Sequence, residues 1–223
     1  MIGSPRVHWR LTDSTNERAK LLAAAGAPHG TLVTADEQSA GRGRQGRAWT
    51  APARSAVLMS LVVHDPGEVL PLIAAVAICE ALPAECAIKW PNDVWLDRRK
   101  LAGILVEGRP QQGWAVLGVG LNVTNTEFPG ELRESATSLR RAGIDTDVEA
   151  TLRLLLPSLD RWLRAPRGAV LDAWRERDAI RGKSVRWASG EGTAAGIDDS
   201  GALLVDIGGT RIVLQAGEIH LLR

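Results

Sequence analysis

Tyrosine is absent from the 223-residue sequence, phenylalanine occurs once and cysteine only twice. Cys79 and Cys86 form neither a metal-ligand spacing nor a disulfide framework, so they favour buried thiols in a reducing cytoplasm. The most apolar segment, 69–82, is too short to cross a bilayer and contains a proline and a glutamate. Arg6, His8 and Arg10 interrupt any apolar run in residues 1–11, so this segment does not resemble a signal peptide. The sequence therefore predicts a cytoplasmic protein with no membrane partner.

The sequence also has no large excess of positive or negative charge, since the formal net charge is +1. Such a balance argues against a nucleic-acid partner, which normally requires a strongly basic face. Lysine is rare, with four residues against 23 arginines, and Lys89 and Lys100 fall in one short segment. The histidines have no metal-ligand spacing, and no metal site built from protein ligands is expected; they are His8, His29, His64 and His220.

Hydrophobic patterning predicts a mixed α/β chain. Ser14 and Glu17 form a capping box that should begin a helix ending at Gly26, and 146–149 form a second one. Pro157 is expected to kink or split the helix that follows. Further helices are predicted at 70–82 and 168–180, and strands at 31–35, 56–63, 87–90, 100–107 and 114–123.

The sequence pattern changes near residue 180. Short strands separated by Gly, Asp and Ser turns follow, as is typical of a small β-barrel or sandwich; they span 183–187, 192–197, 203–207 and 211–214. We therefore expect two domains, 1–180 and 181–223.

Glycine and arginine alternate in the segment that begins at Gly41 and ends at Trp49. Glycines let backbone amides approach an anion, and Arg42, Arg44 and Arg47 offer bidentate donors to phosphate or carboxylate. The same pattern suits an RGG-like nucleic-acid tract or a solvated basic loop. It is not a Walker A loop, which ends in Gly-Lys-Ser/Thr. Without apolar anchors, the loop is expected to be disordered until a ligand binds.

Three later segments carry chemistry-bearing residues. Lys89-Trp90-Pro91-Asn92-Asp93 reads as a strand running into a tight turn. In a regular strand, Lys100 would share an apolar face with Ala102, Ile104 and Val106, opposite Gly103. Two glycines then interrupt the apolar strand Gly118-Val119-Gly120-Leu121-Asn122. Each segment alone could also have a purely structural role. The first could be an ordinary turn, the second a lysine at the end of a strand that reaches solvent, and the third a strand whose glycines permit close packing.

Taken in this order, these segments resemble the catalytic domain of biotin protein ligases, over roughly residues 8–140. The tail Gly217-Glu218-Ile219 resembles the SH3-like domain that ends those enzymes. The resemblance implies an α+β fold with a mixed or antiparallel, class II synthetase-like sheet and a C-terminal SH3-like β-barrel. Twelve residues precede Asp13, so the DNA-binding domain of bifunctional members, and a nucleic-acid partner, are not expected.

The resemblance further implies ATP-dependent ligation of biotin to a lysine of a biotin carboxyl carrier domain, through biotinyl-5′-AMP. ATP and biotin would be substrates, with Mg²⁺ on the phosphates; the oligomeric state stays open, a homodimer included. The implied biotin contacts are Ser14, Thr15, Asn16, Gln38, Gly41, Arg42, Lys100, Gly103 and Gly118. The implied ATP or adenylate contacts are Arg44, Arg47, Trp49, Asn92, Lys100 and Asn122, and the implied catalytic residues are Lys100, Asp93 and Arg44.

The residue chemistry agrees with that reaction. Joining a carboxylate to a triphosphate requires cations around the α-phosphate, and amine attack on the mixed anhydride requires a nearby carboxylate. The alternative enzyme is a lipoate ligase or lipoyl/octanoyl transferase of the same fold, which the complete Gly-Arg loop disfavours. The alternative of another class is a nucleic-acid-binding module, which the near-zero charge disfavours.

Overall fold

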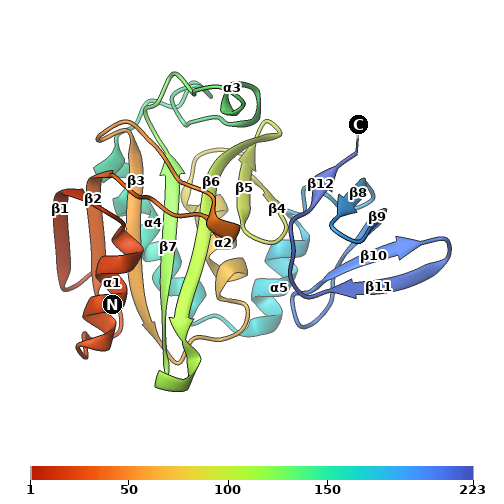
Figure 1. Cartoon of the computed structure of the whole chain (residues 1–223), viewed down its shortest axis with the longest axis horizontal. Coiled ribbons are helices and arrows are strands. Elements are labelled where there is room, and N and C mark those ends of the chain that lie inside the picture. The colour runs from red at the N-terminus through yellow and green to blue at the C-terminus, as the bar shows by residue number, and fades with distance from the viewer. Residues whose placement is uncertain (1, 223) are drawn as a thin grey trace.

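The computed structural model describes residues 2–222 and contains two β-sheets (Figure 1). The larger sheet has seven strands in the order β1-β2-β3-β7-β6-β5-β4. β1 runs parallel to β2 and the other neighbours are antiparallel, so the predicted mixed sheet is confirmed. The strands are β1 (Arg6–Thr12), β2 (Leu32–Gln38), β3 (Ala56–His64), β4 (Ala87–Lys89), β5 (Asp93–Leu96), β6 (Arg99–Arg109) and β7 (Trp114–Asn122).

Helices cover the two faces of this sheet unequally. The apolar, almost wholly buried α2 (Leu70–Ala81) packs on one face, with α4 (Val148–Leu163) and α5 (Arg167–Arg175) against it. On the other face lies α1 (Thr15–Ala24), which packs against β2, β3 and β7 (Figure 1). The rest of that second face is free to hold a cavity, and the short α3 (Leu132–Ser135) lies beside β6.

Strand alternation sends different residue types to the two faces. On β3, Met59 and Leu61 join the core under α2 and α4, while the fully buried Ser60 points toward α1. On β7, Leu117 and Val119 belong to that core, and Gly118 and Gly120 lie on the α1 face. The apolar face therefore supplies the stability, and the other face exposes glycine and polar positions.

The smaller sheet is antiparallel, in the order β11-β10-β9-β8-β12. Its core residues, including Val185 and Leu203, are continuous with the main core, and the Trp90 indole donates a hydrogen bond to Gly201 O at 3.0 Å. The boundary near residue 180 stays a prediction. The strands are β8 (Ser184–Trp187), β9 (Gly190–Ile197), β10 (Leu203–Ile207), β11 (Thr210–Leu214) and β12 (His220–Leu221).

Both predicted capping boxes are wrong in detail. Ser14 is the N-cap of α1 but makes no side-chain capping bond, because Gln38 Oε1 accepts from Thr15 N at 2.7 Å and Glu17 pairs with basic side chains instead. The α4 cap is Asp147, whose carboxylate accepts from Ala150 N at 2.7 Å. Long-range partners thus compete with the local capping pattern.

Other differences have physical causes. Pro157 does not split α4, because it lies on the exposed side, where water can satisfy the freed carbonyl. The helix predicted at 168–180 ends at Arg175. Three strands were not predicted. β1 is an exposed edge strand without an apolar run, β12 is only two residues long, and β5 lies inside the segment 91–99 that was expected to be a connection. β5 turns into β6 through Asp97 and Arg98, both at positive φ without the usual glycine.

Candidate active site

A cavity of about 310 Å³ lies on the α1 face of the main sheet. The sequence-predicted residues that line it are Ser14, Thr15, Asn16, Gln38, Arg42, Arg44, Arg47, Trp49, Asn92, Asp93, Lys100, Gly103, Gly118 and Asn122. Gly41 lies at the base of the loop and lines an adjoining cavity of about 800 Å³. A Cβ at Gly41 would lie 2.3 Å from Trp49 O, so this glycine permits a close approach of the loop stems.

A buried polar network forms the end of the cavity at α1. Gln38 Oε1 accepts from Thr15 N at 2.7 Å and from Thr15 Oγ1 at 3.1 Å. Ser60 Oγ lies 2.8 Å from Thr15 Oγ1 and 2.6 Å from Asn16 Oδ1. Ser60 was not predicted, because a lone serine in an apolar strand has no distinguishing signal. The network fixes side-chain amides and hydroxyls in a buried site, as recognition of a polar ring requires.

The Gly-Arg loop (residues 39–49), which follows β2, folds back on itself over the cavity. Arg42 bridges to Ala48, Trp49 N donates to Gly41 O at 2.9 Å, and Gln45 lies at φ 55°. Its predicted disorder without ligand stays a prediction.

The three loop arginines contact three different parts of the chain. Arg42 pairs with Glu17 of α1. Arg44 donates to Asn92 Oδ1 at 3.2 Å, and Arg47 pairs with Glu218 at 2.5 Å, 171 positions along the chain. Burial lowers the pKa of the Arg44 guanidinium, and Asp93 opposes that shift. Ligand anions would compete with these protein partners for the arginines.

Trp49 lies on the glycine positions of the sheet. A Cβ at Gly120 would lie 2.3 Å from Trp49 Cε2, and one at Gly103 would lie 3.0 Å from its Cζ3. The Lys100 ammonium is 5.8 Å from the indole centroid. Trp49 Nε1 is buried without a hydrogen-bond partner among the described residues. The glycines therefore make room for this indole, which forms a flat wall of the cavity.

The two β7 glycines give a matched prediction. In Gly118→Ala, the Cβ would lie 2.2 Å from Asn16 Oδ1, which is locked by Ser60. We expect this overpacking to lower the free energy of unfolding by about 1–3 kcal/mol. In Gly120→Ala the obstacle is the loop residue Trp49, which can move away, so the expected loss of stability is below about 1 kcal/mol. Because the resemblance places Trp49 among the nucleotide contacts, a lower affinity for ATP is expected in this variant.

Thermal and urea unfolding, with ATP titration as the second readout, check this pair. Equal stability losses in the two variants would contradict the assignment of Asn16 as fixed and Trp49 as movable.

The predicted strand face of Lys100 is wrong. Residue Trp95 pairs with Lys100 and Val94 with Ala102, so the ladder skips Leu101 and β6 carries a bulge. The bulge turns Lys100 to the face of Gly103, where a Cβ would lie 3.3 Å from Lys100 Nζ. Instead of an apolar surrounding, its ammonium has Asp93 Oδ1 at 2.8 Å. Two of the three predicted catalytic residues, Lys100 and Asp93, thus form an ion pair.

A further lysine completes the cationic lining. Lys89 lies directly across the β4–β5 ladder from Asp93 and 5.6 Å from the Trp95 ring centroid. Burial lowers the pKa of Lys89, and Asp93 opposes that shift. The described lining residues include one carboxylate, that of Asp93, and five basic side chains. The basic side chains are those of Arg42, Arg44, Arg47, Lys89 and Lys100. Such an excess suits a polyanion.

The two asparagines assigned to the nucleotide side are tied to the protein. Asn92 Nδ2 donates to Ile104 O at 2.8 Å while its Oδ1 accepts from Arg44. Asn122 Nδ2 donates to Thr137 O at 3.0 Å, and its Oδ1 accepts from Asn125 at 3.1 Å. Asn125 was not predicted. These amides hold the β6 and β7 ends of the cavity wall in place.

Some site types are not found in residues 2–222. These residues contain no grouping of His, Cys, Asp and Glu that could hold a metal ion. None of the helices described in this range is long and apolar enough to cross a membrane. Cys79 and Cys86 are free thiols.

Comparison with known proteins agrees with this architecture. Residues 9–123 match the model of the biotin/lipoate A/B protein ligase family, and residues 182–222 match that of the biotin protein ligase C-terminal domain. The chain belongs to the biotin protein ligase family. The predicted family and fold class are confirmed, and the C-terminal match disfavours the lipoate alternative.

Named relatives of this biotin protein ligase family member extend over most of the chain. A biotin–[acetyl-CoA-carboxylase] ligase of Mycobacterium tuberculosis is 38% identical over 95% of this chain and 87% of its own length. The enzyme of that name from Paracoccus denitrificans is 36% identical over 93% and 97%. A solved biotin protein ligase from Aquifex aeolicus, in complex with biotin and ATP, superposes with a TM-score of 0.86 at 27% identity, over 99% of both chains.

Proposed function

We propose that this protein joins biotin to ATP and transfers the biotinyl group to a lysine of a biotin carboxyl carrier domain of an acetyl-CoA carboxylase. The observation that carries the proposal is the Lys100–Asp93 pair, 2.8 Å apart, in a cavity between a buried polar network and a cluster of arginines. Biotin and ATP are the substrates. The relatives named biotin–[acetyl-CoA-carboxylase] ligase support the choice of acceptor.

In the first step, a biotin carboxylate oxygen attacks the α-phosphorus of ATP, and the bond to the β-phosphate breaks to release pyrophosphate. Lys100, Arg44 and Arg47 are proposed to stabilise the charge that develops on the phosphates. Mg²⁺ would arrive with ATP, held by phosphate oxygens and water. Ser14, Thr15, Asn16 and Gln38 are proposed to bind the biotin rings, and Trp49 to pack on the adenine.

In the second step, the acceptor lysine amine attacks the carbonyl carbon of the mixed anhydride, and AMP leaves. A free lysine is mostly protonated at neutral pH, since its ordinary pKa is about 10.4. Asp93 is proposed to accept the proton that the amine loses. That role requires Lys100 to move from Asp93 toward the ligand anions first.

The proposed partner is the carrier domain, and no nucleic-acid partner is proposed, in line with the net charge of +1. Homodimer formation stays open. A cytoplasmic setting is proposed from the two free thiols.

ATP–pyrophosphate exchange tests the choice of small substrate. With biotin, the rate is expected to rise well above the substrate-free rate, while equimolar lipoate leaves it unchanged. Exchange that depends on lipoate and not on biotin would replace the proposal by the lipoate alternative.

A further inference from the structure

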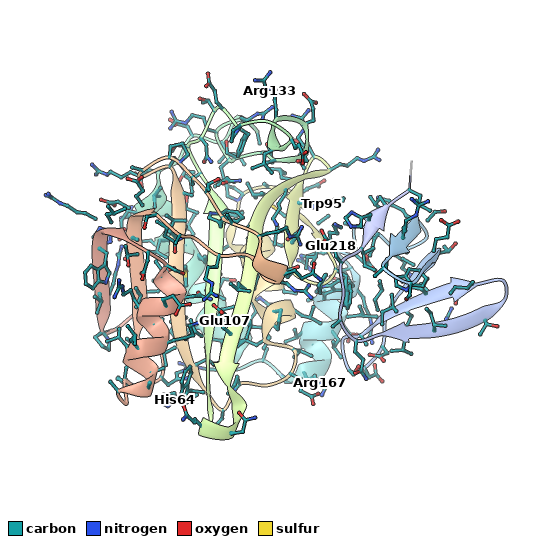
Figure 2. All side chains as sticks on the ribbon, viewed as in Figure 1. His64, Trp95, Glu107, Arg133, Arg167 and Glu218 are labelled. Carbon is teal, nitrogen blue, oxygen red and sulfur yellow. The ribbon has the colours of Figure 1, made fainter. Side chains whose placement is uncertain are left out.

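A balanced cluster of charged side chains lies between α1, β6 and the base of the Gly-Arg loop, around Glu107 (Figure 2). Glu107 Oε2 accepts from Asn16 Nδ2 at 2.9 Å. Its Oε1 lies 3.3 Å from Lys20 Nζ and 3.6 Å from Arg42 Nη1. Glu17 also pairs with both Lys20 and Arg42. Glu107 is therefore the member of the cluster that contacts the buried network as well as the loop.

These contacts determine the orientation of the Asn16 amide. Asn16 Oδ1 lies 2.6 Å from Ser60 Oγ, whereas Nδ2 faces Leu105 O at 3.4 Å and Glu107. Both N–H groups of the amide are thereby directed at protein acceptors. A carbonyl oxygen has two lone pairs, so Asn16 can offer a ligand one further acceptor position. A flipped amide would offer a donor instead, and it would turn Oδ1 toward the Glu107 carboxylate and lose that hydrogen bond.

The same carboxylate influences the stem of the Gly-Arg loop. Arg42 forms the bridge to Ala48 at the point where the two loop stems meet. Its guanidinium is half exposed, so the loop contributes this group from outside the core. The pairs of Arg42 with Glu17 and Glu107 add a side-chain anchor at the α1 end of the cavity to the backbone hydrogen bonds that Ser39 N and Ala40 N donate to Thr12 O and Asp13 O at 2.9 Å.

We propose that Glu107 is a positioning residue for biotin binding, which links the orientation of Asn16 to the closed position of the Gly-Arg loop through Arg42. This inference rests on the proposed function. Glu107 would not contact the substrate itself. Its carboxylate contacts both Asn16 of the pocket and Arg42 of the loop. Ligand binding at Asn16 and loop closure should then depend on each other, since the same carboxylate accepts from Asn16 and attracts Arg42.

Glu107→Gln tests the link, because the neutral amide keeps the shape but loses the charge-assisted contacts. We expect biotin affinity, measured by titration calorimetry, to fall about tenfold, as for the loss of a hydrogen bond to a charged group. Trypsin should continue to cut after Arg44 and Arg47 in the presence of biotin, whereas the wild-type loop is expected to become protected. KM for the carrier domain should stay within about twofold, which a general loss of structure would not allow.

Glu17→Gln is the matched variant, because Glu17 contacts Arg42 and Lys20 but not Asn16. Its expected loss of biotin affinity is about threefold or less. Glu80→Gln, which removes an ion pair with Arg161 far from the cavity, should behave as wild type. Equal losses in the Glu17 and Glu107 variants, or an unchanged Glu107→Gln protein, would overturn the proposal.

A second variant and a binding measurement distinguish loss of the positioning role from poor folding and from failure of the proposed function. Should Glu107→Gln fold poorly, Glu107→Asp retains the charge beside Lys20, yet its shorter side chain cannot span Asn16 and Arg42, and the same loss of loop protection is expected. Calorimetry requires no turnover. Wild-type protein that binds biotin without catalysing exchange would refute the proposed ligase, whereas equal affinities of wild type and both Glu107 variants would refute the positioning role.

Discussion

Lys100→Ala is expected to form biotinyl adenylate at least about a hundredfold more slowly than wild type. Two anions, the biotin carboxylate and the α-phosphate, must meet in this step, and a compact cation between them lowers their repulsion. Lys100 already lies in the cavity with its ammonium 2.8 Å from Asp93 and 5.8 Å from the Trp49 ring centroid. The replacement removes that cation and leaves the strand in place. Single-turnover pyrophosphate release measures the effect.

Lys100→Arg is not expected to restore the rate, because a planar guanidinium cannot replace a point charge beside Gly103 and Trp49. The free energy of unfolding should change by no more than about 1 kcal/mol, since the Lys100–Asp93 pair is partly exposed. The exposed Lys183→Ala is the control for loss of a lysine. Adenylation by Lys100→Ala within about threefold of wild type would show that Lys100 is not the bridging cation, and Lys89 would be tested next.

Asp93→Asn is expected to slow transfer of biotin to the carrier domain by about 10²–10⁴, the usual contribution of a general base. The same change should slow adenylate formation by less than about tenfold. A neutral amide can still accept a hydrogen bond from Lys100, but it cannot take a proton from the incoming amine. The measurement is a pair of single-turnover experiments, pyrophosphate release for the first step and appearance of modified carrier domain for the second.

Asp206→Asn is the control for this variant, because Asp206 pairs with Arg211 on the β10–β11 hairpin of the small sheet. It should change neither half-reaction. Loss of both half-reactions to the same degree in Asp93→Asn would mean that Asp93 acts mainly by holding Lys100 for adenylation, and the proposed proton transfer would be wrong.

Many of the polar residues that line the cavity could be predicted from the sequence because they occur in short local motifs. The sheet then brings those motifs together by register. Lys89, Asp93, Gly103 and Gly120 form one row across β4, β5, β6 and β7 on the α1 face. Once the strands pair in this order, segments that are far apart in the sequence must line the same surface.

What the sequence could not show depends on contacts between distant elements. Ser60 reads as one more residue of a buried strand until α1 is placed over it. The bulge that turns Lys100 into the cavity has no glycine to mark it, so a regular alternation predicts the wrong face. Glu218 reaches Arg47 from the far end of the chain, and only the docking of the small sheet brings them together.

The mass of a biotin carboxyl carrier domain after incubation with this protein tests the proposed ligase activity. One added biotinyl group, on lysine, is expected when both biotin and ATP are present, and none when either is omitted or when Lys100→Ala replaces the wild type at short times. An unmodified carrier domain in the complete reaction, with folded protein that binds biotin, would show that the protein does not catalyse this transfer.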